Sequence, residues 1–235
     1  MPLLDWKEID LVVFDVDGTL YNQRRLQLAM LRRLLVATWQ TRSLDTLLTL
    51  RTFRQVREAL GEQPGADFMT LQYARTARQR HKTEGEVRAL VAEWMEQKPL
   101  DLLAGCRYPH VQALFAGLRA AGKQIAVFSD YPARDKLTAL GLQAQPVVCA
   151  TDAGIARLKP DPCGLLAILR QTGVPAARAL MIGDRFDRDA AAASQAGVRA
   201  LVRARQAHPQ IDTFRAYDDA VFQPMLMRAP MPTAA

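Results

Sequence analysis

Two carboxylates stand two residues apart in the run 15–20 (DVDGTL), where they could do chemistry. Asp15 and Asp17 come directly after the apolar residues 11–14. Side chains two residues apart face the same side at the end of a strand, so both would meet at one site. Such a pair repels unless it shares a proton or a cation. Gly18 then permits a tight turn.

A second acidic run, residues 183–189 (GDRFDRD), directly follows the apolar residues 180–182. It supplies Asp184, Asp187 and Asp189. Carboxylates gathered from the ends of separate strands make an oxygen-ligand site that suits Mg²⁺. For this run alone, an acidic helix N-terminus that complements the helix dipole is the alternative.

Two weaker elements fit the same site. Ser129 follows an apolar run that ends at Phe128, so its hydroxyl and nearby backbone N–H groups could hold an anion. Lys159 lies in the run 157–162 (RLKPDP), a rigid loop before a helix, where one ammonium can neutralise clustered negative charge. Either alone is typical of ordinary loop chemistry, but together with the acidic runs they favour an anion site.

Short apolar runs, continuous rather than alternating, are the elements that must position these residues. They cover residues 9–14, 124–128, 146–149, 179–182 and 198–202. Such runs are typical of strands buried on both faces of a parallel sheet. From residue 110 onward they alternate with helical patterns, which predicts an α/β fold with an open, doubly wound, Rossmann-like sheet. Ligands sit beyond the carboxyl ends of the strands in such sheets.

About a hundred residues without a strand signal separate the first two strands. Apolar residues recur in them at helical spacing, around 28–35, 44–56, 68–73 and 87–94. We therefore expect a helical insert over 23–105 in a core made of 1–22 and 106–235. The tail from about residue 206 is predicted to be rich in loops.

The composition of the 235-residue chain, 49% hydrophobic and 23% charged, is typical of a soluble globular protein. It excludes wholesale disorder. No stretch approaches the roughly 20 apolar residues that cross a bilayer, and the first residues carry acids where a secretion signal needs a basic and then an apolar run. We therefore expect a cytoplasmic protein without a membrane partner.

Positive charge is concentrated in the predicted insert. The net charge is +7, and residues 24–82 hold twelve Lys or Arg against four Asp or Glu. This surplus would attract an anionic small molecule or nucleic acid. Because the segment lacks interleaved aromatic residues and any recognisable nucleic-acid-reading motif, the sequence argues against nucleic acid.

In this order, the four elements resemble the haloacid dehalogenase superfamily. The run 15–20 matches its DxDGT[LV] signature, Ser129 its second motif, Lys159 its third, and Gly183-Asp184 with Asp189 its fourth. The resemblance covers about residues 9–205. The helical insert resembles the C1-type cap of the family's phosphatase branch.

This resemblance implies a phosphatase that acts on a small soluble phosphomonoester. Asp15 would be the nucleophile that forms an aspartyl-phosphate. Asp17 would protonate the leaving alkoxide and then deprotonate the hydrolytic water. Ser129 and Lys159 would hold phosphoryl oxygens. The dehalogenase branch lacks an acid at the position of Asp17, so this residue favours phosphoryl transfer.

The implied cofactor is Mg²⁺, held by the carboxylates of Asp15 and Asp184 and the backbone carbonyl of Asp17. Asp189 would be a further acidic contact, and Asp187 is the second choice for that role.

Substrate contacts are expected from Gly18, Thr19 and Asp130 in the core. Arg24 and Arg25, just after the first motif, are predicted to bind the substrate from the insert. Two alternatives stay open: a phosphomutase that uses the same residues, and a non-catalytic binding module that uses the basic insert.

Overall fold

The computed structural model describes residues 4–61 and 68–229, and its core is one six-stranded parallel sheet. The strand order is β3-β2-β1-β4-β5-β6. The strands are β1 (Leu11–Phe14), β2 (Gln124–Ser129), β3 (Val147–Cys149), β4 (Ala179–Gly183), β5 (Arg199–Arg203) and β6 (Asp212–Phe214). This order is that of a doubly wound sheet, and the predicted fold class is confirmed.

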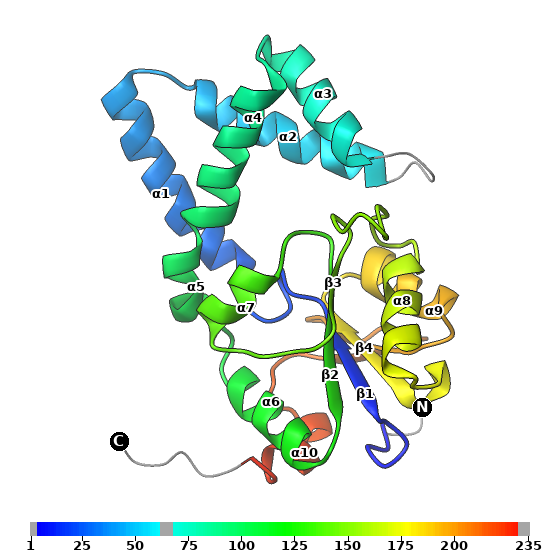
Figure 1. The fold of residues 1–235 in the computed structure, drawn as a ribbon. Coiled ribbons are helices and arrows are strands. Elements are labelled where there is room, and N and C mark those ends of the chain that lie inside the picture. The colour runs from blue at the N-terminus through cyan, green and yellow to red at the C-terminus, as the bar shows by residue number, and fades with distance from the viewer. Residues whose placement is uncertain (1–3, 62–67, 230–235) are drawn as a thin grey trace.

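Helices cover both faces of the sheet (Figure 1). On one side lie α6 (Val111–Ala120), α7 (Arg134–Leu140) and α10 (Gln223–Leu226), and on the other α8 (Cys163–Thr172) and α9 (Ala191–Gln195). Successive residues of β1 point to opposite faces. Val12 and Phe14 belong to the core cluster with Phe115, and Val13 to the cluster with Ile168. Both faces are therefore buried, which explains the continuous apolar runs.

A helical insert stands over the carboxyl ends of the strands (Figure 1). It contains α1 (Gln23–Thr41), α2 (Asp45–Gly61), α3 (Phe68–Arg80), α4 (Glu84–Val91), the π-helical stretch Ala92–Gln97 and α5 (Leu100–Cys106). The chain leaves and re-enters the core side by side, since Tyr21 and Arg107 form an antiparallel bridge. None of the described helices is both long and apolar enough to pass through a bilayer.

The tail is more ordered than its expected loop character. Residues 212–214 add β6 to the sheet, and α10 follows. Tyr217 and Phe222 are buried, and the Tyr217 hydroxyl donates to the Thr19 carbonyl oxygen at 2.9 Å. These aromatic rings bring enough apolar area to hold the segment against the core. Residues 230–235 of the tail lie outside the described residues.

Candidate active site

Strands β1 and β4 are neighbours in the sheet, and this pairing brings the two acidic runs together. Phe14 pairs with Ile182, so Asp15 and Asp184 emerge at the same edge. Carboxylate oxygens of Asp15, Asp184 and Asp189 lie within 4.8 Å of one another. We call these three residues the acidic cluster.

Asp189 is held in the cluster by backbone donors. Its Oδ2 accepts from the N–H groups of Asp184 and Arg185, each at 3.0 Å. Asp187 instead has a side chain that is 66% exposed and is paired with Arg185. Of the two candidates for the last acidic contact, the structure therefore places Asp189 at the site.

The Lys159 ammonium is the cation inside the cluster. It is buried, and its Nζ lies 2.6 Å from both Asp15 Oδ1 and Asp189 Oδ1. Burial opposes its charge, but the pKa of Lys159 is raised well above its usual value because Asp15, Asp189 and Asp130 surround it. Asp130 positions the loop that carries Lys159, since its Oδ1 accepts a hydrogen bond from the Lys159 backbone N–H at 2.9 Å. Lys159 is therefore held as a permanent positive charge against the Asp15 carboxylate.

One lysine does not balance the cluster. Burial raises the pKa of Asp15 well above its usual value, although Lys159 opposes the rise. Burial and the charge of Asp189 raise the pKa of Asp184 to about 7. Three carboxylates face one ammonium, so the cluster has an excess of negative charge that a divalent cation with oxygen ligands would balance. The residues present thus fit Mg²⁺.

The turn after β1 is shaped to bring its backbone close to this cluster. Gly18 has a φ of +92°, and a Cβ there would lie 2.2 Å from Asp184 Oδ2. Glycine is therefore required for close approach. The Thr19 hydroxyl donates to Asp15 Oδ2 at 2.8 Å and orients the carboxylate. Ser129 is buried at the end of β2, where its hydroxyl accepts from the Tyr131 N–H at 3.2 Å.

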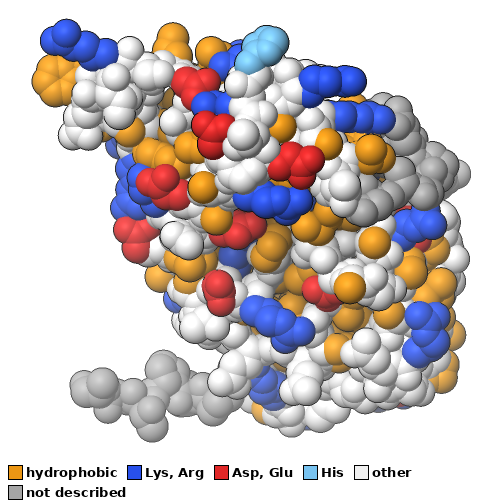
Figure 2. All heavy atoms as spheres, turned by 45° about the horizontal axis from the view of Figure 1, so that its top comes forward, with side chains coloured by type: hydrophobic (Ala, Val, Ile, Leu, Met, Phe, Trp, Pro, Cys, Tyr) orange, Lys and Arg blue, Asp and Glu red, His pale blue; other side chains and the backbone are white. Residues whose placement is uncertain are grey.

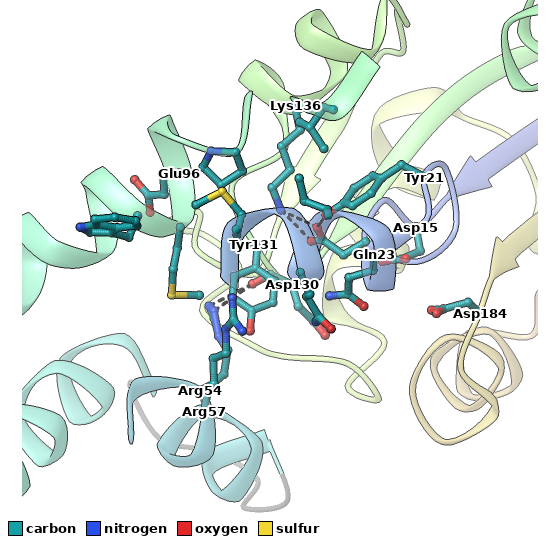
Figure 3. A pocket seen from close by; sticks show the side chains of 18 of the residues that line it. Asp15, Tyr21, Gln23, Arg54, Arg57, Glu96, Asp130, Tyr131, Lys136 and Asp184 are labelled. Carbon is teal, nitrogen blue, oxygen red and sulfur yellow. Dashed lines mark hydrogen bonds and ion pairs between the residues drawn. The ribbon is translucent and has the colours of Figure 1, made fainter. Parts of the chain in front are cut away.

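Asp17 occupies a different environment from Asp15. The Lys136 ammonium lies 2.6 Å from its Oδ1 and 2.8 Å from its Oδ2, and the Tyr21 hydroxyl donates to the same carboxylate (Figure 3). Burial would raise the pKa of Asp17, but Lys136 and Tyr21 outweigh burial and lower it. In this structure Asp17 is therefore held ionised beside its cation, which is the state that a general base requires.

Replacing Lys136 by methionine should destabilise the protein through Asp17. The side chains of this pair are only 14% and 13% exposed, so the carboxylate would stay buried without its cation. We expect the free energy of unfolding at pH 7 to fall by about 2–3 kcal/mol in urea denaturation with chelator present.

The difference in the free energy of unfolding between the parent protein and Lys136→Met should become smaller as the pH falls. A carboxyl group whose pKa is lowered by folding contributes stability above its unfolded value near about 4 and loses it below. Lys7→Met, at an exposed lysine, is the control. Equal free energies of unfolding for Lys136→Met and Lys7→Met at pH 7 would show that the Asp17–Lys136 ion pair contributes nothing to stability.

A pocket of about 540 Å³ lies between the insert and the strand ends, lined by Asp15, Asp17 and residues of the insert. Arg54 and Arg57 of α2 reach into it (Figure 3). Arg57 is buried, donates to the Asp130 carbonyl oxygen at 3.0 and 3.2 Å, and lies 4.0 Å from the centre of the Tyr131 ring. Its Nε has no hydrogen-bond partner among the described residues.

Arg24 and Arg25, which we predicted to bind the substrate, are not among the residues that line this pocket. Residues three and four apart share a helix face, and on α1 the pocket face holds Gln23, Leu26 and Met30. Arg24 and Arg25 fall between these positions and are exposed. The pocket is lined instead by Arg54 and Arg57, three residues apart on α2, and by Arg185 and Arg188, which follow β4.

Basic side chains do not gather into one patch on the face seen in Figure 2. Lysine and arginine are scattered there among acidic and apolar side chains. Nucleic-acid binding draws on clustered positive charge, so this face offers no support for it.

Tyr21, Lys136 and Arg57 were not identified as site residues from the sequence. Tyr21 directly follows the first motif, and this position next to two carboxylates in the sequence could have indicated that its hydroxyl belongs to the site. Lys136 lies 119 residues from Asp17, and Arg57 lies 73 residues from Asp130. Neither pair shows a local pattern.

Comparisons with known proteins identify the class. Residues 9–197 match the haloacid dehalogenase-like hydrolase family. A phosphoglycolate phosphatase from Rhodospirillum rubrum is 33% identical over 196 residues, which are 81% of this chain and 78% of that protein. The chain therefore belongs to the haloacid dehalogenase-like hydrolases, and it is an enzyme. The family predicted from the motifs is confirmed.

Two solved structures share the fold. A 2-haloacid dehalogenase from Pseudomonas syringae pv. Tomato superposes with a TM-score of 0.64 at 23% identity, covering 93% of this chain and 98% of its own. CbbY from Rhodobacter sphaeroides, in complex with phosphate, gives a TM-score of 0.56 at 20% identity, and the match covers 90% of this chain and 96% of CbbY.

Proposed function

We propose that this enzyme is a Mg²⁺-dependent phosphatase that hydrolyses a small phosphomonoester. The observation that carries the proposal is the pair of carboxylates after β1. Asp15 lies in an acidic cluster that could hold a metal, beside Lys159, while Asp17 is paired with Lys136 and accepts a hydrogen bond from Tyr21. The phosphatase activity named for the Rhodospirillum rubrum relative supports this reaction type.

Hydrolysis would proceed in two steps. The Asp15 carboxylate attacks the phosphorus atom, so that an acyl-phosphate bond forms as the bond to the alcohol oxygen breaks. Asp17 gives a proton to that oxygen, and the alcohol departs; for this step Asp17 must first take up a proton, because Lys136 lowers its pKa in this structure. The Asp17 carboxylate then takes a proton from water, which attacks phosphorus and releases inorganic phosphate and free Asp15. The sum is one phosphomonoester and one water giving one alcohol and one phosphate.

Cations would make the attack of one anion on another possible. Lys159 offsets charge on Asp15, and Mg²⁺, when bound by Asp15, Asp184, Asp189 and the Asp17 carbonyl, supplies further charge neutralisation. Arg54 and Arg57 add positive charge to the pocket, which favours entry of a phosphate dianion. Ser129 is the last residue of β2, and its hydroxyl would hold a phosphoryl oxygen.

The proposal is tested by phosphate release from p-nitrophenyl phosphate and a panel of metabolite phosphates. We expect turnover with Mg²⁺ and none with a chelator. Formation of an isomeric sugar phosphate without release of phosphate would identify a phosphomutase instead. No turnover by folded protein that binds Mg²⁺ would contradict the phosphatase and favour the binding module.

Metal binding should also stabilise the fold independently of activity. At 100 times its dissociation constant, Mg²⁺ should add about 2.7 kcal/mol to the free energy of unfolding and raise Tm. Asp184→Asn should abolish this shift, because it removes a member of the acidic cluster. Asp187→Asn is the matched control in the same loop and should keep the shift. A shift retained in Asp184→Asn would place the metal elsewhere.

A further inference from the structure

Beside its charged residues, the pocket has an apolar part of its lining that comes from the insert. Six residues of α1, the 92–97 stretch and α5 form what we call the apolar wall. They are Met30, Leu34, Trp94, Met95, Leu100 and Leu103. Leu34, Met95 and Leu100 are partly exposed, so their side chains are available to a ligand. Glu96 also lines the pocket, and its carboxyl group lies across the view from Asp184 (Figure 3).

The volume of the pocket exceeds what a phosphate and a two-carbon acid need. Pockets of about 300–1,000 Å³ take drug-sized molecules, and this one measures about 540 Å³. A very small polar leaving group would leave the apolar wall uncovered.

We infer that the natural leaving group is an apolar alcohol of several carbons, which packs on the apolar wall while its phosphate reaches Asp15. This inference rests on the proposed phosphatase function and specifies its substrate class. Met30 and Met95 are adaptable side chains that suit ligands of irregular shape. Leu31 also lines the pocket and is 41% exposed, so the apolar lining continues to the surface of the insert. A chain longer than the pocket therefore has a path outward.

A series of n-alkyl monophosphates tests the inference. Their alcohols have nearly equal acidity, so differences in kcat/KM report binding of the leaving group rather than its chemistry. From methyl to hexyl phosphate, kcat/KM should rise by up to about fourfold for each buried methylene, which corresponds to about 0.8 kcal/mol. Hexyl phosphate should exceed 2-phosphoglycolate as a substrate.

Two neighbouring leucines of α1 provide a matched pair of variants. Leu34 lines the pocket, whereas Leu35 is 53% exposed and is not among the lining residues. Leu34→Gln should lower kcat/KM for hexyl phosphate by about tenfold and leave methyl phosphate unchanged. Leu35→Gln should change neither. Met95→Gln, at a lining residue of the 92–97 stretch, should repeat the Leu34→Gln result, and Tm confirms that each variant folds.

The outcomes separate this inference from the function on which it rests. Turnover of methyl phosphate and 2-phosphoglycolate, with no rise along the alkyl series, would overturn the apolar leaving group while the phosphatase stands. An equal loss for methyl and hexyl phosphate in both Leu34→Gln and Met95→Gln would also overturn it. No phosphate released from any substrate in the presence of Mg²⁺ would instead contradict the proposed function.

Discussion

Asp15→Asn should lower the rate of phosphate release by at least about a thousandfold. The amide has the shape of the carboxylate but cannot attack phosphorus to form an acyl-phosphate. Asp15 is buried and held by Thr19 and Lys159, so no second carboxylate can occupy its position without a change in the loop. Steady-state release of inorganic phosphate with Mg²⁺ measures the effect.

The loss in Asp15→Asn should not come from unfolding. Burial raises the pKa of Asp15, which means that its charge opposes folding at neutral pH when no metal is bound. A neutral side chain relieves this cost, and Lys159 keeps Asp189 as an ion-pair partner, so the variant should remain folded, which Tm in chelator measures. Activity within about tenfold of the parent would show that Asp15 is not the nucleophile.

Asp17→Asn should produce a loss that depends on the leaving group. An alkoxide needs a proton as it departs, whereas p-nitrophenolate leaves without one. General acid catalysis contributes about 10²–10⁴-fold, so an alkyl phosphate should lose this factor in the first step. With p-nitrophenyl phosphate, the first step should continue and the hydrolysis of the intermediate should slow.

Rapid mixing distinguishes these steps. Asp17→Asn should release about one equivalent of p-nitrophenol per active site in a burst, followed by slow turnover, because the aspartyl-phosphate accumulates. Glu96→Gln, which alters another acid that lines the same pocket, should show neither the burst nor the loss. Equal losses for alkyl and aryl substrates without a burst would contradict a proton-transfer role for Asp17.

The core fold could be predicted because its signals are local. Continuous apolar runs such as 11–14 are needed wherever a strand is covered on both faces, and the structure buries both faces of β1. The tail was harder to predict because β6 has three residues, and its place depends on pairing with β5. A short strand at an edge has no periodic pattern of its own.

The sequence by itself determined the acidic cluster, since Asp15, Asp184 and Asp189 follow strands that a parallel sheet must align at one edge. Only the tertiary structure decided what surrounds it. Lys136 meets Asp17 from another helix, and Arg57 rather than Arg24 enters the pocket. Such contacts depend on how helices rotate and pack over the sheet, and helix rotation is set by burial across the whole molecule rather than by neighbouring residues.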